Sequence, residues 1–316
     1  MVNNNLLHAQ KNVIMRRMKT LLSVITALGG ALATQASEMW TIRMPETYIL
    51  PSYAKATYIS RMGERHGNGS HLSMQEYSLN VPIVDGRKSH VGLLHLNLQG
   101  NATVTVMDVG GGLDLHKDEL FLFSLPATAI LPLSEDDRIM FTAMPYIASD
   151  GMHPSRGWDL ALVADYYSHH SDTLSYNLGI ASAMRLGQYV VMPHISFSWQ
   201  MTPEWMLRLH NSQIAALYTA STHFKIGPAL SNEGGCWMVD TPIGQRVFRV
   251  RSLATCLLAE YDFTQPGKNK RAITAAVGMT LATTAEFCQR TLDKDRIEAF
   301  HYKPGVVVSM GMDFRF

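Results

Sequence analysis

Long hydrophobic runs are missing from most of this sequence. Downstream of Ala36, no stretch reaches the roughly 18 uninterrupted apolar residues that a transmembrane helix needs. This excludes a helical inner-membrane protein, unless the N-terminal segment itself stays attached as an anchor. A surplus of basic charge is missing as well, because setting aside the four basic residues before Ala36 leaves 23 of the 27, against 26 acidic ones. Without a basic face, we expect no nucleic-acid partner.

Cysteine is scarce, and its spacing excludes further classes of site. The three cysteines, Cys236, Cys256 and Cys288, form neither a CxxC pair nor a cluster with histidine at metal-ligand spacing. We therefore expect no metal site and no cofactor. An odd number of thiols in an oxidising compartment is most simply met by one disulfide and one buried thiol.

Helical periodicity is nowhere sustained, whereas alternation with a period of two recurs along most of the chain. In 94–106 the even positions are apolar or small and the odd positions, from His95 to Thr105, are polar. Such alternation predicts β-strands with one apolar and one polar face. A secreted or periplasmic β-sandwich would show the same pattern, since its inner face is apolar and its outer face is polar.

Turn signals such as Asp85-Gly86, Thr202-Pro203 and Pro266-Gly267 divide these runs at spacings typical of antiparallel neighbours. The expected strands are 54–62, 71–84, 89–106, 119–131, 138–149, 158–167, 173–184, 189–200, 204–211, 214–226, 246–262, 270–283 and 304–316. That count is odd, whereas single-chain bacterial barrels carry an even number, so either one segment is not a strand or 39–50 adds another. We predict an all-β fold, a closed antiparallel transmembrane β-barrel of about twelve strands, within a range of ten to fourteen.

The first 36 residues resemble an export signal. A basic segment ending at Lys19 precedes an apolar stretch over 21–32 and the small-x-small sequence Thr34-Gln35-Ala36. We expect cleavage after Ala36, with a short retained anchor as the alternative. Residues 1–14 show no apolar register and indicate an upstream start codon. The predicted organisation is therefore a signal peptide over 1–36 and one outer-membrane barrel domain over 37–316.

Loop lengths indicate which end of the barrel faces the periplasm, because periplasmic turns are short and outer loops are long. We count back from a last strand that ends in the periplasm. The long segments 227–245 and 285–303 then fall outside, and the short segments 211–212 and 264–269 fall inside.

The cysteines follow from this assignment. Cys236 and Cys288 both lie in the long outer segments, where a disulfide between them could join two loops. Cys256, in the middle of a strand, is expected to pack as a small hydrophobic residue.

Arg249 and Arg251 share one side of an expected strand. Projecting into a lumen, these cations would favour anionic solutes. The alternative is a structural ion pair across the barrel, for which the candidate carboxylates are Asp159, Asp165, Glu204 and Asp313. Most other expected inward positions are Ser, Thr, Asn, Ala and Gly, which make a mild rather than a selective lining.

Enzyme signatures are weak. His169-His170-Ser171-Asp172 is the densest cluster of catalytic residue types, but consecutive residues of a tight turn point in divergent directions and cannot easily converge on one substrate. Pairs that could meet across strands combine His194 or His210 with Asp159, Asp165 or Glu204. We assign no catalytic residue and predict that the chain is not an enzyme.

The last eight residues, 309–316, alternate polar or small residues with apolar ones and end on an aromatic. Their spacing, Ser309-x-Gly311-x-x-Phe314-x-Phe316, resembles the C-terminal signal by which bacterial outer-membrane barrels are recognised for assembly. The resemblance implies insertion in the outer membrane of a Gram-negative bacterium, with outer-membrane lipid and the barrel-assembly machinery as partners.

A second resemblance lies upstream. The segments Pro193–Trp199, Trp205–Leu209 and Tyr218–Ser221 are similar to a family of uncharacterised bacterial outer-membrane β-barrel proteins. Neither resemblance brings a substrate or a catalytic residue with it.

The predicted function is therefore a passive one. We expect a porin-like channel or carrier for small polar solutes, or a structural barrel. A surface adhesin that binds through its long outer loops, around Gly234-Gly235 and 293–296, is one alternative. An outer-membrane hydrolase is another, and the β-sandwich is the alternative outside the membrane.

Overall fold

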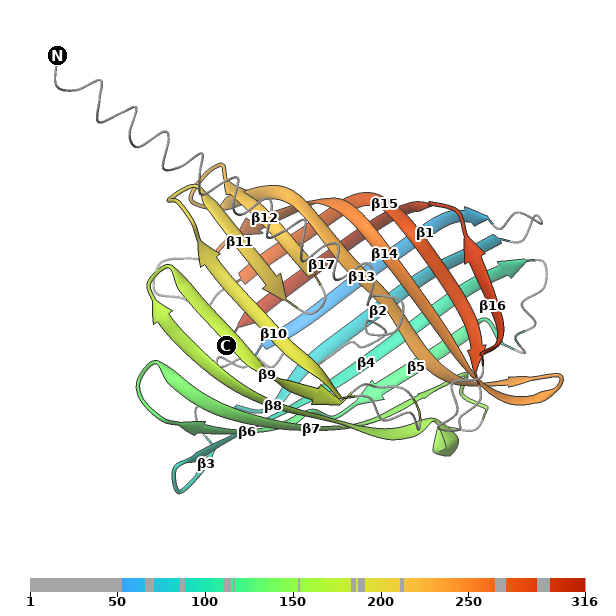
Figure 1. The fold of residues 1–316 in the computed structure, drawn as a ribbon, viewed down its shortest axis with the longest axis horizontal. Coiled ribbons are helices and arrows are strands. Elements are labelled where there is room, and N and C mark those ends of the chain that lie inside the picture. The colour runs from blue at the N-terminus through green and yellow to red at the C-terminus, as the bar shows by residue number, and fades with distance from the viewer. Residues whose placement is uncertain are drawn as a thin grey trace, which may run out of the picture. The chain divides into compact units, whose positions relative to one another are not determined.

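The computed structural model describes residues 53–65, 71–85, 89–110, 115, 117–152, 154–182, 186, 191–210, 213–264, 271–288 and 296–315. In these ranges one sheet of seventeen strand segments curls round and closes (Figure 1). The helical element among them is a 3-10 turn, η1 (Pro154–Gly157), and no helix of the described residues has the length and apolar character to span a bilayer. The predicted signal peptide over 1–36, with the upstream start over 1–14, lies outside the described residues and stays a prediction.

The strand segments follow one another along the sheet in nearly sequential order. They are β1 (Tyr53–Arg65), β2 (His71–Val84), β3 (His90–Val91), β4 (Leu94–Gly110), β5 (Glu119–Ser124), β6 (Ala127–Pro132), β7 (Asp137–Ser149), β8 (Trp158–Ser171), β9 (Leu174–Ser182), β10 (Val191–Gln200), β11 (Trp205–His210), β12 (Gln213–Thr219), β13 (Phe224–Thr241), β14 (Gly244–Asp262), β15 (Arg271–Cys288), β16 (Arg296–Tyr302) and β17 (Val306–Arg315).

Three barrel strands are interrupted. β2 and β3 both pair with β4, β5 and β6 both pair with β4 and β7, and β16 and β17 both pair with β15. Counting each interrupted strand once, the seventeen described segments make fourteen antiparallel strands. The predicted closed antiparallel barrel is confirmed, at the upper end of its predicted size.

The first and last strands close the barrel. β1 pairs with β17 from Tyr53 opposite Arg315 to Met62 opposite Val306. Closure matters because a bilayer offers no hydrogen-bond partner to the backbone groups of an open sheet edge. Below, the terminal end is the end of the barrel where β1 begins and β17 stops, and the distal end is the opposite one.

Two predicted segments are corrected by the structure. The segment 214–226 contains two strands, because a turn at Ala220–His223 separates β12 from β13, with the Ala220 amide donating to the Phe224 carbonyl at 2.9 Å. The segment 227–245, predicted as an outer loop, belongs largely to β13, which turns tightly into β14 after Thr241. With this extra strand, His210 and Gln213, which pair where β11 ends and β12 begins, lie at the distal end. The short connection between them was predicted inside with the C-terminus.

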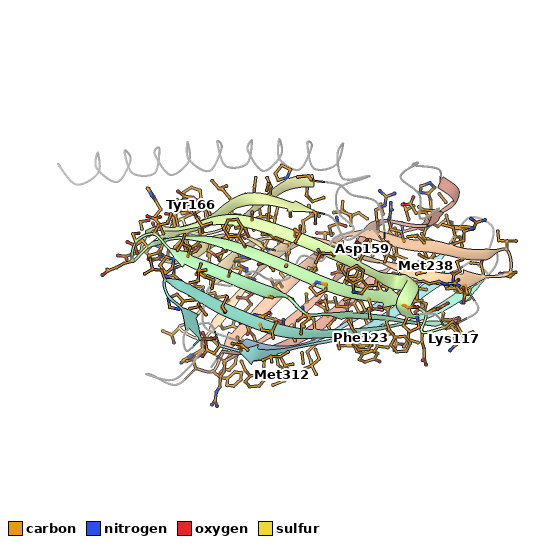
Figure 2. The ribbon with its side chains drawn as sticks, turned by 90° about the horizontal axis from the view of Figure 1, so that it is seen from below. Lys117, Phe123, Asp159, Tyr166, Met238 and Met312 are labelled. Carbon is orange, nitrogen blue, oxygen red and sulfur yellow. The ribbon has the colours of Figure 1, made fainter. Side chains whose placement is uncertain are left out.

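Apolar side chains cover the outer face of the barrel. On β2, Tyr77, Leu79 and Ile83 are about half exposed, while their neighbours in sequence face inward. Figure 2 shows the same outward direction for Phe123 of β5 and Met312 of β17, which are 51% and 39% exposed. A sandwich would bury such residues between two sheets, so the sandwich alternative is wrong for this closed barrel.

An apolar core packs at the distal end of the barrel. β13 crosses over to pair in parallel with β7 at Met238 and Ser149, although β8 to β12 separate these two strands elsewhere in the sheet (Figure 1). The Asp150 amide donates to the Met238 carbonyl (3.1 Å), and the Asp150 carboxylate accepts from the Asp240 amide (2.8 Å). Large side chains of this distal core include Leu72, Met74, Met107, Leu120, Met144, Tyr146, Trp237, Phe248 and Phe287. This packing narrows the barrel at its distal end.

Candidate functional site

The inner wall formed by β2, β4 and the strands beside them carries polar side chains, most of which are neutral. Asn80 donates to Gln99 (3.1 Å) across β2 and β4, and Asn101 donates to Ser124 (3.2 Å) across β4 and β5. We call this surface the polar strip; its members are Glu76, Ser78, Asn80, Asn97, Gln99, Asn101, Thr103 and Thr105. It is the predicted polar face of 94–106, extended onto β2 by direct cross-strand pairing.

Across the barrel, the inner wall of β11 to β15 carries an apolar cluster, which we call the apolar wall. Buried small and aliphatic side chains pack together there, with the partly buried Met206 against them: Ala215, Leu217, Ala229, Cys256, Leu258 and Ala276. Cys256 thus packs as a small hydrophobic residue, as the sequence predicted. The lining of the barrel is therefore amphipathic, with hydrogen-bonding groups on one side and hydrocarbon on the other.

One ion pair crosses the apolar wall. Arg208 of β11 contacts Glu260 of β14, with β12 and β13 lying between their strands. The residue opposite Arg208 on β12 is Ala215, and Ala215 lies opposite Ala229 on β13. These small side chains leave room for the long guanidinium and carboxylate arms to meet, and the pair neutralises its own charge.

A second pair joins β8 to β10 over the intervening β9. The Asp165 Oδ1 and His194 Nδ1 atoms are 2.7 Å apart, and the side chains of Asp165 and His194 are 1% and 12% exposed. Gly179 lies directly between them, opposite Asp165 on one side and His194 on the other. A Cβ atom at Gly179 would come within 2.2 Å of Asp165 Oδ1, so the contact depends on the missing side chain. This pair was one of several that the sequence left open.

Replacing Gly179 by alanine should break this pair. The added methyl would also meet the Ala164 carbonyl oxygen at 2.1 Å, and overpacking of this kind costs about 1–3 kcal/mol. We expect a lower urea midpoint in detergent, followed by the mobility difference between folded and unfolded barrel on a gel. Gly100→Ala is the matched control, because a Cβ there first meets the flexible Ile83 side chain at 3.3 Å. Equal midpoints for the two variants would contradict the role assigned to Gly179.

Chemically, the pair holds an imidazole whose Nε2 can accept a proton, a property that general bases share. Ser198 Oγ is hydrogen-bonded to a different histidine, His210 Nε2, at 3.3 Å. His169, His170 and Ser171 lie exposed at the terminal end of β8. Within the described residues, no group of three His, Cys, Asp or Glu side chains could hold a metal ion.

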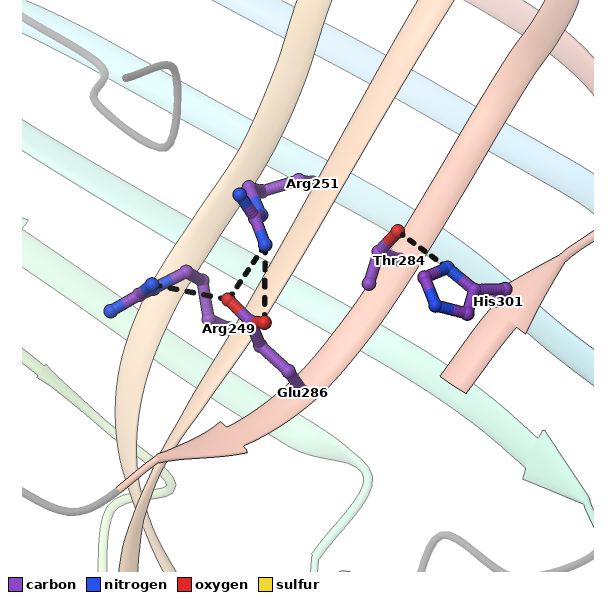
Figure 3. Close-up of polar contacts among 5 residues, drawn as sticks. All are labelled: Arg249, Arg251, Thr284, Glu286 and His301. Atoms are coloured by element: carbon purple, nitrogen blue, oxygen red, sulfur yellow. Dashed lines mark hydrogen bonds and ion pairs between the residues drawn. The ribbon is translucent and has the colours of Figure 1, made fainter. Parts of the chain in front are cut away.

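Arg249 and Arg251 meet at one carboxylate. Glu286 Oε1 lies 3.1 Å from Arg249 Nη1 and 3.0 Å from Arg251 Nη2 (Figure 3). The three side chains are 7%, 11% and 1% exposed for Arg249, Arg251 and Glu286. The partner is thus on the neighbouring strand β15 and is none of the four carboxylates that the sequence suggested.

Arg249 and Arg251 were expected to point into the lumen, but they lie on the other face of β14. β14 pairs with β13 without a register shift, so Arg249 and Arg251 share a face with the exposed Leu257 and lie opposite to the inward face of Cys256. This face is little exposed to solvent near the distal end, because the Arg249 and Arg251 side chains are 7% and 11% exposed. Their role as lumen cations stays a prediction.

The predicted disulfide is not formed in this structure, where Cys236, Cys256 and Cys288 are buried thiols. Cys236 lies on β13 and Cys288 on β15, with β14 between them, and not on two loops. Two interstrand steps separate their backbones by about 9–10 Å, whereas a disulfide requires Cα atoms closer than about 7 Å.

The predicted assembly signal forms most of the closing strand. Ser309 and Gly311 pair with Ile59 and Thr57 on β1, and Phe314 pairs with Ala54. Phe316 lies outside the described residues. Recognition of this strand by assembly machinery stays a prediction.

The adhesin alternative relied on two expected outer loops, around Gly234-Gly235 and 293–296. Gly234 and Gly235 are buried within β13 and are not part of a loop. Residues 293–295 lie outside the described residues, and Arg296 begins β16.

A protein-family model with the description "Domain of unknown function (DUF6268)" matches residues 113–315. No curated protein matches the sequence.

Several solved structures are similar. The COG4313 outer membrane channel from Pseudomonas putida F1 is 13% identical, with a TM-score of 0.47 and coverage of 86% of this chain and 99% of that chain. OpdQ from Pseudomonas aeruginosa is 9% identical, with a TM-score of 0.30 and coverage of 84% and 100%. The outer membrane protease OmpT from Escherichia coli is 10% identical, with a TM-score of 0.23 and coverage of 86% and 100%. Because the sequence identities and TM-scores are low, we infer nothing about the activity of this chain from these structures.

Proposed function

This chain belongs to the DUF6268 family, and we propose that it is an outer-membrane β-barrel that acts as a passive, porin-like channel for small polar solutes. Outer-membrane lipid would surround it, and the barrel-assembly machinery would insert it after export. No catalytic role is part of the proposal.

The outer face supports the membrane location. Apolar residues such as Leu79, Phe141 and Val277 are about half exposed, and they come from strands all around the closed sheet. Hydrocarbon is a suitable environment for such a surface, and closure satisfies the strand backbones within it. The export signal and the C-terminal motif are consistent with this destination.

The polar strip is the observation that carries the channel proposal. Its amides and hydroxyls lie inside a barrel whose outside is apolar, which is the arrangement of barrels with a polar lumen. Because Arg208 pairs with Glu260, part of the charge on the inner wall is compensated. Small solutes without net charge therefore fit this lining better than ions do.

The purified full chain should produce stepwise conductance in a planar bilayer. We expect small steps, because the distal core narrows the barrel and ions pass poorly where side chains are apolar. The same preparation after heat denaturation is the control for contaminating pores. Silence at every voltage and salt concentration, with gel mobility showing folded barrel, would remove the channel proposal and leave a structural barrel.

A further inference from the structure

Four oxygen atoms of the polar strip are buried without a hydrogen-bond partner among the described residues. They are Asn80 Oδ1, Asn97 Oδ1, Asn101 Oδ1 and Thr105 Oγ1. Asn97 and Thr105 are 5% and 0% exposed, so the surrounding side chains hold them in place. Buried polar atoms in proteins are nearly always paired, and four unpaired oxygens on one wall of one barrel form an unusual group.

The register aligns these oxygens. Asn80 of β2 lies directly opposite Asn101 of β4, and Glu76 lies directly opposite Thr105. Asn97, Asn101 and Thr105 follow one another at every fourth residue of β4, which places successive members about 13 Å apart along the strand. The group therefore forms a ladder that follows the strand direction and not a single point.

The free groups are mainly acceptors. Asn80 Nδ2 donates to Gln99, and Asn101 Nδ2 donates to Ser124, so each of these amide groups already has a partner inside the wall. Ser78 Oγ donates to Glu76 and accepts from Thr103. A complementary solute must bring hydrogen-bond donors, and it should carry no negative charge because Glu76 stands in the same row.

We propose that the polar strip is a binding site for uncharged polyhydroxylated solutes, such as monosaccharides or polyols. Hydroxyl groups of the solute would donate to the ladder of oxygens, which requires the side chains that now cover these atoms to move aside. The proposal rests on the proposed channel function and adds the class of solute.

The test measures how glucose blocks the ion current through single barrels. In the wild type, glucose should interrupt the current in a saturable way. The double variant Asn97→Leu/Asn101→Leu keeps the number and branching of the side-chain heavy atoms but removes two acceptors, so the half-blocking concentration should rise about tenfold or more. Asn177→Leu is the matched control, because Asn177 is also a buried asparagine but lies on β9, away from the strip. Its half-blocking concentration should stay within about twofold of the wild type.

Two further arms make the outcomes separable. Thr105→Val removes one acceptor with almost no change in shape, and it decides the question if the leucine variant does not fold. Gluconate, which has a carboxylate beside its hydroxyls, should block less well than glucose, because its carboxylate and that of Glu76 repel each other. Two results would refute the binding site: a wild-type barrel that conducts without any effect of glucose, or a half-blocking concentration of glucose that is the same for both strip variants as for the wild type. In either case, water alone would contact these oxygens. If the wild type does not conduct at all, the channel proposal itself fails.

Discussion

Replacing Glu286 by leucine should destabilise the folded barrel by about 3–5 kcal/mol, the usual cost of removing one partner from a buried ion pair. Glu286 is 1% exposed and accepts hydrogen bonds from both Arg249 and Arg251. Without it, two guanidinium groups remain where little water can reach them. The urea midpoint in detergent, read from gel mobility or tryptophan fluorescence, should fall accordingly.

Two comparisons separate lost pairing from lost packing. Replacing all three residues together, Arg249→Met, Glu286→Leu and Arg251→Met, should restore most of the stability, because no uncompensated charge then remains. Glu260→Leu removes the other arginine partner, but Arg208 and Glu260 are more exposed, at 20% and 14%. The loss of stability in Glu260→Leu should therefore be smaller than in Glu286→Leu, since solvent screens a partly exposed charge. Equal losses for Glu286→Leu and Glu260→Leu would contradict the importance given to burial.

The barrel itself was largely predictable, because period-two alternation is a property of each strand alone. The failure at β13 has a physical cause. Gly227, Pro228, Gly234 and Gly235 lower the local preference for a strand, so the segment was predicted as a loop. In the structure, pairing with β14 runs from Phe224 opposite Tyr261 to Thr241 opposite Gly244. This long ladder outweighs the local preference, and only the partner strand could reveal it.

The candidate site was predictable in part. The polar face of 94–106 follows from alternation, and the structure places it inside the barrel. Contacts between strands depend on register, which alternation does not specify. Asp165 and His194 meet because Gly179 falls between them, and Arg249 meets Glu286 because β15 is aligned with β14 at that point. A glycine within an alternating strand was the available signal for the first of these contacts.

Deleting residues 306–316 should abolish folding, both in cells and in detergent. β17 pairs with β1 on one side and with β15 on the other, so its loss removes both ladders and leaves two strands with unpaired edges. An open edge in hydrocarbon costs several kcal/mol for each unsatisfied backbone group. Protease resistance and the folded gel mobility should both disappear. A truncated chain that still shows them would refute closure through β17.

A second variant separates closure from recognition. Phe314→Ala/Phe316→Ala leaves the backbone of β17 intact, including the pairing of Phe314 with Ala54 and with Arg271. Purified chain should therefore refold in detergent with little change, apart from the lost ring contact between Phe263 and Phe314. In cells the same variant should accumulate unfolded, if the terminal aromatics are what the assembly machinery recognises. Normal assembly of this variant in the outer membrane would show that β17 acts through its hydrogen bonds alone, and that its resemblance to an assembly signal is coincidental.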